Sequence, residues 1–353
     1  MTARSRRLIG WVLGTALGLL GLGLLTVYLL LRPERFTAYL QSRARDAGLD
    51  LELAYPAIPT LLPHPAIQLQ GLTLSAPGAS QPILVADHGE VELPWRALFQ
   101  HSAGIAWLEL DAPRVDIDAL QTWIHDLPPE TFAQAHSLPQ IDAGISIFHG
   151  SLVGHRQQPW LDDLNINAGA LHPGRLFHLD MAGTLADAHP FRLQLEMLPA
   201  VGRHGISLQQ MQWRLDYDRR VHTHLQGQLE WLGGRDLSLQ LAGQVQRPDK
   251  PEAQLQLRML PASSGRPLQF ELHYDGSDGQ ADLLLPPDQM LQWWSLLKTN
   301  TVTPSLSLPD WQGHLRADQL DIGDAHLEGL QIDAEPAKDS SAPAPAASTG
   351  RRP

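Results

Sequence analysis

Apolar and polar residues alternate with a period of two along most of the chain. Residues 67–74 read Ile-Gln-Leu-Gln-Gly-Leu-Thr-Leu, and residues 254–259 read Gln-Leu-Gln-Leu-Arg-Met. Such alternation is typical of strands that bury one face and expose the other. The same pattern recurs, with glycine or proline between segments, in residues 49–53, 83–86, 91–93, 106–117, 145–152, 164–168, 177–185, 191–197, 208–216, 222–231, 237–245, 268–274, 314–317, 320–322 and 326–332. It predicts a mainly β protein with a mostly antiparallel sheet.

A few segments have the period of a helix instead. In residues 32–48, Phe36, Leu40 and Ala44 share one helical face, Pro33 suits the first turn and Gly48 suits the end. Two interpretations of this helix stay open: it packs on the following domain, or it lies at the head-group level of a membrane. Further helical segments are predicted at residues 94–100, 118–135 and 288–298.

A long apolar segment, residues 8–31, precedes all the strands and contains no charged residue. It holds about 24 residues, and a helix needs roughly 20 to cross a bilayer. A cleavable signal peptide has a shorter apolar region and a small-residue cleavage site, whereas this segment ends in Tyr-Leu-Leu-Leu-Arg-Pro. Arg4, Arg6 and Arg7 precede it. The sequence therefore predicts one uncleaved transmembrane helix, with residues 1–7 cytoplasmic and the bulk of the chain outside.

Composition narrows the function further. The 353 residues carry a formal net charge of −12, and a nucleic-acid-binding surface is basic, so the sequence argues against a nucleic-acid partner. The chain has no cysteine and thus no disulfide. We expect two β-rich parts after the first helix, residues 49–140 and 141–334. Residues 335–353, rich in proline, serine and alanine, are predicted to be disordered.

No motif announces chemistry. The sequence contains no P-loop, no dinucleotide-binding glycine pattern, no Gly-x-Ser-x-Gly and no His-Glu-x-x-His. His222 and His224 would share one face of a strand, but no carboxylate or cysteine cluster accompanies them at ligand spacing. The paired aspartates fall in predicted turns, where aspartate commonly caps the backbone. We therefore expect no catalytic residue, no metal site and no cofactor.

Three stretches of the chain resemble a known family. Residues 83–118 end in a strand containing Leu108, Leu110 and the Pro113-Arg114-Val115 sequence. Residues 160–185 contain Leu-Asp-Asp-Leu-Asn at 161–165 and Pro-Gly-Arg at 173–175, and residues 313–335 supply a closing strand set. In this order, after one membrane helix and one short helix, they resemble the AsmA-like family of bacterial envelope proteins, of which this chain would be a compact member.

The resemblance implies an elongated, curved β-sheet with a groove or taco-like shape and an apolar inner face. It also implies a single-pass protein of the bacterial inner membrane with a periplasmic bulk. Its function would be in phospholipid transport or outer-membrane assembly and envelope homeostasis, with lipid acyl chains and other envelope proteins as partners. The apolar strand residues expected to contact lipid are Leu69, Leu72, Leu74, Leu193, Leu195, Leu237, Leu239, Leu241, Leu255 and Leu257.

Two alternatives remain open at this level. Alternation alone fits a closed β-sandwich whose apolar face is filled by a second sheet. A chain of this size and anchor would then suit a non-enzymatic structural subunit of an envelope machine, such as the N component of a type II secretion system. A periplasmic hydrolase is a third hypothesis, but it would need a polar cleft that the sequence does not announce.

Overall fold

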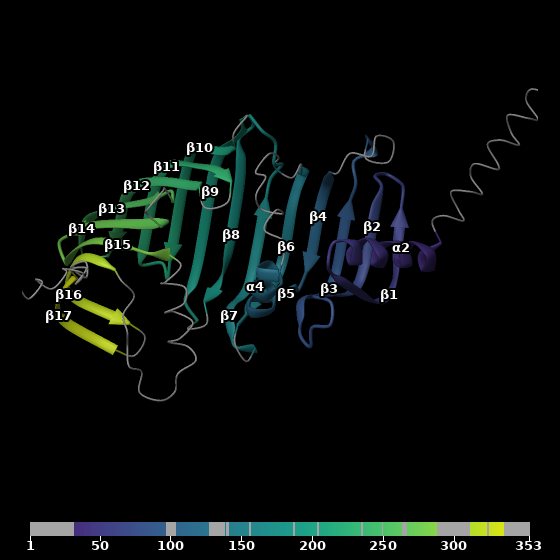
Figure 1. The fold of residues 1–353 in the computed structure, drawn as a ribbon, viewed down its shortest axis with the longest axis horizontal. Coiled ribbons are helices and arrows are strands. Elements are labelled where there is room, and N and C mark those ends of the chain that lie inside the picture. The colour runs from purple at the N-terminus through teal and green to yellow at the C-terminus, as the bar shows by residue number, and fades with distance from the viewer. Residues whose placement is uncertain are drawn as a thin grey trace, which may run out of the picture. The chain divides into compact units, whose positions relative to one another are not determined.

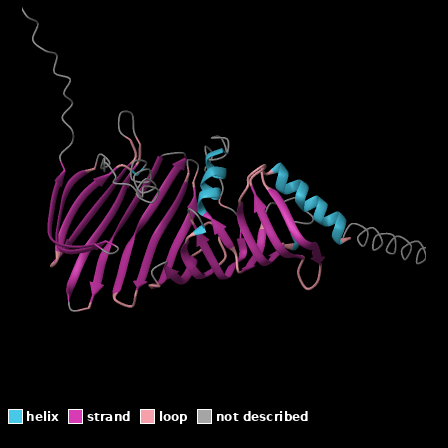
Figure 2. Cartoon of the chain, turned by 90° about the horizontal axis from the view of Figure 1, so that it is seen from below, coloured by secondary structure: helices cyan, strands magenta, loops and turns pink. Residues whose placement is uncertain are grey.

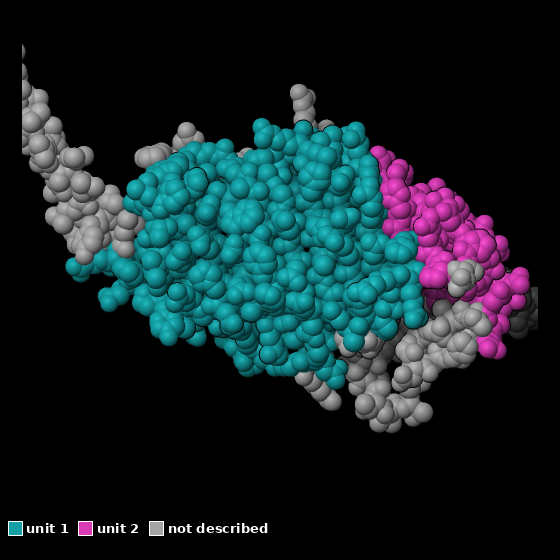
Figure 3. All heavy atoms as spheres, turned by 180° about the vertical axis from the view of Figure 1, so that it is seen from behind, with its two compact units in different colours: residues 1–222 teal, residues 223–353 magenta. Residues whose placement is uncertain are grey.

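The computed structural model describes residues 32–96, 104–126, 138, 141–154, 157–185, 188–202, 205–233, 236–248, 250–262, 267–287, 311–322 and 325–334. Within these residues the chain is mainly β: seventeen strands form one long, mixed, mostly antiparallel sheet, accompanied by two short helices (Figures 1 and 2). The chain divides into two compact units, residues 1–222 and 223–353 (Figure 3).

The first unit contains both helices and most of the strands. In chain order they are α2 (Pro33–Asp46), β1 (Asp50–Thr60), β2 (Ala66–Ser75), β3 (Pro82–Glu92), β4 (Ile105–Asp111), β5 (Arg114–Asp116), α4 (Ile117–Asp126), β6 (Ile141–Val153), β7 (Pro159–Ala168), β8 (Phe177–Leu185), β9 (Pro190–Val201) and β10 (Ile206–Tyr217). Consecutive strands mostly pair antiparallel, as expected for strands joined by short turns. β6 is the exception, because it runs parallel to both β4 and β5.

The parallel pairing has a local cause. A parallel partner requires a crossover connection, and α4 lies in the segment between β5 and β6. The Asp116 carboxylate caps α4 by accepting the Ala119 N–H at 2.9 Å, and it also accepts Gln157 Nε2 at 2.7 Å. Asp116 is buried, so these two donors satisfy a carboxylate that burial would otherwise penalise.

Helix α2 packs against β1, while α4 makes its main contacts with β3 and β5. Thr37 Oγ1 ties α2 to the sheet by accepting the Ala57 N–H at 2.8 Å. Trp123 of α4 donates its indole N–H to the Gly48 carbonyl oxygen at 3.1 Å. Gly48, with φ +75°, ends α2 in the left-handed conformation that glycine adopts at low cost. The predicted helix at residues 32–48 is thus confirmed.

The second unit continues the antiparallel meander. β11 (Val221–Gly233) begins at the boundary, followed by β12 (Asp236–Arg247), β13 (Lys250–Leu260), β14 (Gln269–Gly276), β15 (Gly279–Leu285), β16 (Gln312–Ile322) and β17 (Ala325–Ala334). From β12 to β17 each strand pairs antiparallel with the next one in sequence. The order of strands in space therefore follows the order in the chain.

Several sequence predictions need correction. Residues 83–86 and 91–93 belong to one strand, β3, and residues 314–317 and 320–322 both belong to β16. Strand β15 was not predicted, since three consecutive leucines at 283–285 break the alternation. β1 runs through Pro56, which the register tolerates because it shifts between Tyr55 and Ile58.

Other predictions fall on residues that are not described: the apolar segment 8–31, the helix at 288–298, the tail 335–353 and most of the predicted helix beyond Asp126. Among the described helices, none has the length and apolarity needed to cross a membrane.

The buried apolar side chains of the described residues include seven alanines as well as leucines, isoleucines, valines, one phenylalanine and one methionine. Ala57, Ala86 and Ala253 are almost completely enclosed, but among the described residues Pro199 is the one large side chain that is fully buried. Ile83, Leu164 and Phe177 are buried, but many other large apolar residues on the strands are only half-buried. A close-packed core of the kind found between two layers encloses its leucines and phenylalanines. The described strands enclose only part of theirs.

We predict that Gly227→Ala strongly destabilises the second unit. A Cβ atom on Gly227 would lie 1.7 Å from the Gln240 carbonyl oxygen of β12, and one on Gly243 would lie 1.9 Å from the His224 carbonyl oxygen. The two glycines therefore allow β11 and β12 to approach closely. Forcing a methyl group into this contact should cost about 3 kcal/mol, measured as a lower thermal unfolding midpoint of the full chain.

The matched control is Gly169→Ala, where the nearest atom would be a carbonyl oxygen at 3.7 Å, an ordinary contact. Equal midpoints for the two variants would contradict the close approach of β11 and β12.

Candidate functional site

The candidate site is the apolar face of the sheet, which the strand registers assemble one pair at a time. In the first unit, residues that pair directly across neighbouring strands point to the same face. One row of such partners consists of Ile67, Val91, Leu108, Ile145, Ala168, Leu179, Leu195 and Trp213. The adjacent row on this face consists of Leu69, Gly89, Leu110, Ile147, Ile166, Met181, Leu193 and Leu215. Both rows are uncharged from end to end.

The opposite face of the same strands carries a polar row. The row between the two apolar ones consists of Gln68, Glu90, Glu109, Ser146, Asn167, Asp180, Gln194 and Arg214. Cross-strand pairs hold it together: Arg192 donates to Asp180 at 2.8 Å and Gln194 donates to the same carboxylate oxygen at 3.0 Å. The Arg192 hydrogen bond and its charge lower the pKa of Asp180 in spite of the opposing effect of its burial.

A line of left-handed residues runs through β2, β6 and β7 of the first unit and through the bend between β4 and β5. Gly71, Ala112, His149 and Asp163 have φ values of +61°, +49°, +53° and +48°. At this line the apolar pattern shifts by one residue, for example from Ile67 and Leu69 to Leu72 and Leu74 in β2. An extra residue in a strand produces such a shift. Leu69 can therefore follow the same face as Leu72 and Leu74 although they are an odd number of positions apart.

The second unit repeats the two-faced arrangement. Leu241, Leu257, Leu272 and Leu283 oppose one another directly on β12 to β15, and Met259 and Phe270 continue the same face. Of the leucines predicted to contact lipid, Leu241 pairs with Leu257, Leu239 with Met259 and Leu255 with Tyr274. Leu237 lies on the same strand at the same parity as Leu239.

Exposure separates this face from an ordinary core. Within the described rows the large side chains, such as Leu193, Leu195, Trp213 and Leu257, are half-buried, whereas Leu72 and Leu241 are buried. Burial of a whole leucine side chain stabilises a fold by about 1.5–3 kcal/mol. The half-buried rows therefore retain apolar surface that a further apolar molecule can cover.

Sequence reasoning missed several members of the rows. Met181 and Trp213 lie beside the predicted Leu193 and Leu195, and their place in the alternation of β8 and β10 could have indicated them. Leu283 was missed together with its strand. Ala112, His149 and Asp163 carry no sequence signal for a left-handed conformation.

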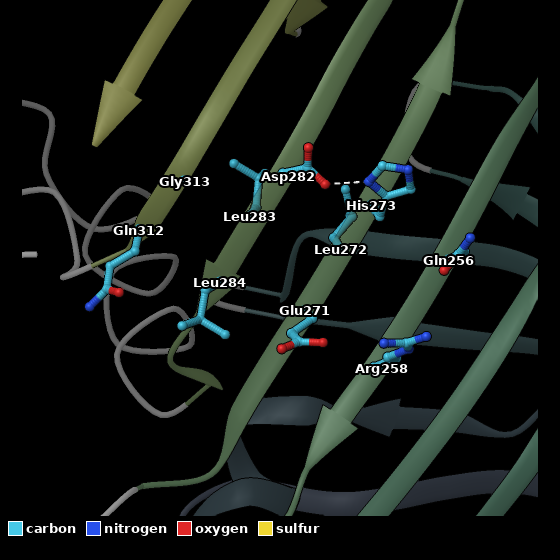
Figure 4. Close-up of a pocket in the computed structure, with 10 residues that line it drawn as sticks. All are labelled: Gln256, Arg258, Glu271, Leu272, His273, Asp282, Leu283, Leu284, Gln312 and Gly313. Carbon is cyan, nitrogen blue, oxygen red and sulfur yellow. Dashed lines mark hydrogen bonds and ion pairs between the residues drawn. The ribbon is translucent and has the colours of Figure 1, made fainter. Parts of the chain in front are cut away.

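The polar face of the second unit carries a shallow depression of about 500 Å³ (Figure 4). Its lining includes Gln256, Arg258, Glu271, His273, Asp282, Leu284 and Gln312. Asp282 contacts His273 on β14 and lies 3.2 Å from His314 Nε2 on β16, so one carboxylate bridges two histidines. Among the described residues no group of three or more histidine, aspartate or glutamate side chains could hold a metal ion. His222 contacts Asp216 instead, with Nδ1 and Oδ1 2.6 Å apart.

A cluster of charged side chains lies where β12 connects to β13 and β14 connects to β15. Arg247 donates to both carboxylate oxygens of Asp278, with Nη2 2.6 Å from Oδ1, and Lys250 Nζ lies 3.0 Å from Oδ2. The Tyr274 hydroxyl donates to Oδ1 at 3.0 Å. The Arg247 guanidinium therefore lowers the pKa of Asp278 far below its usual range, and burial raises the pKa of Tyr274.

Comparison of the chain with protein-family models, curated proteins and solved structures found no match.

We predict that Asp278→Asn destabilises the second unit by about 2 kcal/mol, since charge-assisted hydrogen bonds are worth about 1.5–3 kcal/mol. Because the pKa of Asp278 is lowered in the fold, its contribution is present above the unfolded value of about 3.9 and is lost as the pH falls below it. The wild-type unfolding midpoint should therefore fall more steeply below pH 4 than that of the variant.

Asp282→Asn is the control, because its partners His273 and His314 are exposed and such pairs contribute little. If Asp282→Asn lowered the unfolding midpoint at pH 7 as much as Asp278→Asn, the Arg247–Asp278 cluster would not stabilise the fold more than an exposed ion pair does.

Proposed function

We propose that the chain is a membrane-anchored protein that holds lipid acyl chains on the apolar face of its sheet, without performing a reaction. The observation that carries this proposal is the pair of uncharged rows whose large side chains remain half-buried. Water contact with those side chains is unfavourable in proportion to their apolar area. An acyl chain would remove that area from water, and it has no polar group that needs a hydrogen-bond partner.

The dimensions of the rows fit such a ligand. Each row in the first unit passes through eight strands, and neighbouring strands lie about 4.8 Å apart, so it extends about 34 Å. The hydrocarbon core of a bilayer is about 30 Å thick, and each acyl chain occupies about half of it. A chain lying across the strands would thus stay in contact with leucine, isoleucine and methionine over its whole length.

The chemistry of the rows favours binding over catalysis. Neither row contains a titratable or nucleophilic group, and on the opposite face Asp180 pairs with Arg192 and Asp282 with His273 and His314. Each buried methylene contributes about 0.8 kcal/mol, so affinity would come from chain length and not from the head group. The proposed ligand class is therefore phospholipid acyl chains.

The proposed location follows from the sequence. Residues 8–31 would anchor the chain in the inner membrane, and Arg32 directly precedes α2. The N-terminal strands would then start at the bilayer surface, with the bulk of the chain in the periplasm. The resemblance to AsmA-like proteins supports the same assignment and adds a role in phospholipid transport or outer-membrane assembly.

The proposal requires that the apolar face be the inner side of a curved groove. The line of left-handed residues through β2 to β7 favours curvature, because bulges bend strands and increase their twist. In the rival arrangement, a structural subunit of an envelope machine, the same face would be covered permanently by protein.

We predict that a photo-reactive amino acid at Leu193 or Leu195 of the full chain crosslinks to lipid in cells. The two leucines belong to the two apolar rows of β9, so lipid acyl chains should lie within reach. The measurement is mass spectrometry of the purified crosslinked chain, which identifies the added mass as lipid.

Gln194 is the matched control, since it lies between the two leucines and faces the polar side. Equal lipid crosslinking from Gln194, or protein adducts alone from both leucines, would reject the acyl-chain site.

We also predict that Leu257→Asp lowers the lipid that co-purifies with the full chain by on the order of tenfold, because a carboxylate on this face makes acyl burial unfavourable. Leu257 opposes Leu241 and Leu272 in the middle of the second unit's apolar face. Lipid per protein is quantified by mass spectrometry after purification in mild detergent.

Gln256→Asp adds the same charge one position away, on the exposed polar face. It should leave the bound lipid unchanged, and an equal loss in this variant would show that charge alone, and not the apolar face, governs retention.

A further inference from the structure

The outward face of α2 differs from every other described helical surface. Phe36, Leu40 and Ala44 are half-buried, and Thr37 accepts a hydrogen bond from the Ala57 N–H of β1. This side of α2 therefore packs against β1. Arg35, Tyr39 and Arg43, each one position before these residues and spaced by four, form the adjacent stripe of the helix, and all three are exposed. Spacing by four places them above one another on a helix.

Tyr39 and Arg43 form one ordered unit within this face. Arg43 Nε donates to the Tyr39 hydroxyl at 3.1 Å, and the guanidinium carbon lies 5.4 Å from the Tyr39 ring centroid. Tyr39 is 53 % exposed although it also stacks near Phe36, with ring centroids 6.4 Å apart. The hydrogen bond to Tyr39 raises the pKa of Arg43, so its charge persists at all ordinary pH values.

The charges of α2 favour an anionic partner. Arg32, Arg35, Arg43 and Arg45 outnumber Glu34 and Asp46, and the Arg43–Asp46 pair is long, at 3.7 Å, with both side chains largely exposed. The rest of the chain is acidic, with a net charge of −12 overall. The basic face of α2 therefore contrasts with the net charge of the protein, and it would be attracted to an anionic surface.

The position of this face in the chain identifies the partner. The uncharged segment that the sequence predicts to cross a membrane ends at residue 31, and α2 begins at Pro33. Two residues reach at most about 7 Å. The first turn of α2 would therefore lie at the head-group level, where tyrosine is enriched and arginine binds phosphate.

We propose that Arg35, Tyr39 and Arg43 dock α2 on the phosphate head groups of anionic phospholipids. The neighbouring side of the helix packs on β1, so this docking would orient the first strands relative to the bilayer. The inference rests on the membrane anchoring in the proposed function, but not on lipid being held by the sheet.

The test uses the full chain in lipid nanodiscs and exploits the absence of cysteine. Ser42→Cys places one nitroxide on the exposed side of α2, next to Arg43. Collision with a neutral, water-soluble nickel complex then reports how far the label is shielded by head groups. Discs of phosphatidylcholine alone are compared with discs that contain half phosphatidylglycerol, at low and high salt.

The expected result is a label that is shielded in the anionic discs and accessible in the neutral ones. Each arginine near an anionic surface contributes about fivefold, so Arg35→Gln with Arg43→Gln should weaken docking by on the order of 30-fold and abolish the difference between the discs. About 1 M salt should abolish it as well, since charges are then screened beyond about 3 Å. Circular dichroism and the unfolding midpoint verify that each variant is folded.

Arg45→Gln is the control, because it removes the same charge from a different side of the helix and should preserve the shielding in anionic discs. Equal accessibility of the wild-type label in both kinds of disc would overturn the proposal. So would an Arg45→Gln variant that behaves like the double variant, since general attraction would then suffice. Lipid crosslinking at Leu193 and Leu195 is read separately, so failure of docking and failure of the acyl-chain site are distinguishable.

Discussion

In a single-layer sheet, the apolar side chains on one face remain in contact with water unless another apolar group covers them. Along the two apolar rows of the first unit and the polar row between them, seven successive strand pairings keep apolar residues on one face and polar residues on the other. Because the large side chains of the two apolar rows are only half-buried, contacts between neighbouring strands do not by themselves cover this face. The demand for an apolar cover is the constraint from which the proposed ligand and its geometry follow.

The polar face meets the complementary requirement of remaining in water. Its members include neutral amides and the Arg192–Asp180 ion pair. Glu90 and Glu109 lie directly opposite each other, so one strand pair keeps two carboxylates side by side in contact with water. A face built in this way has little affinity for another apolar surface. Two-sidedness thus restricts any apolar ligand or partner to one side of the sheet.

The sequence predicted most strands and the apolar face because a period of two is a local signal. All ten predicted leucines lie on described strands, and Leu241 opposes Leu257 as the alternation required. Consecutive leucines concealed β15, because they obscure which residues share a face.

Contacts between residues far apart in the sequence could not be predicted from a local pattern. The Arg247–Asp278 contact joins positions 31 residues apart, and no local pattern connects them. The left-handed conformations of Ala112, His149 and Asp163 are likewise unpredictable from composition, since tertiary contacts and not residue type select them.

The line of left-handed residues also limits how the chain can change by insertion or deletion. Each strand that carries the shift contains one more residue than strict alternation would require, and its neighbours carry the matching shift. Removing Gly71 alone would turn Ile67 and Leu69 toward water and Gln68 toward the apolar face, while the neighbouring strands kept their orientation. A length change in one strand is therefore tolerable only when adjacent strands change in step. Along this line the lengths of adjacent strands are coupled, whereas the length of a turn between them is not constrained in this way.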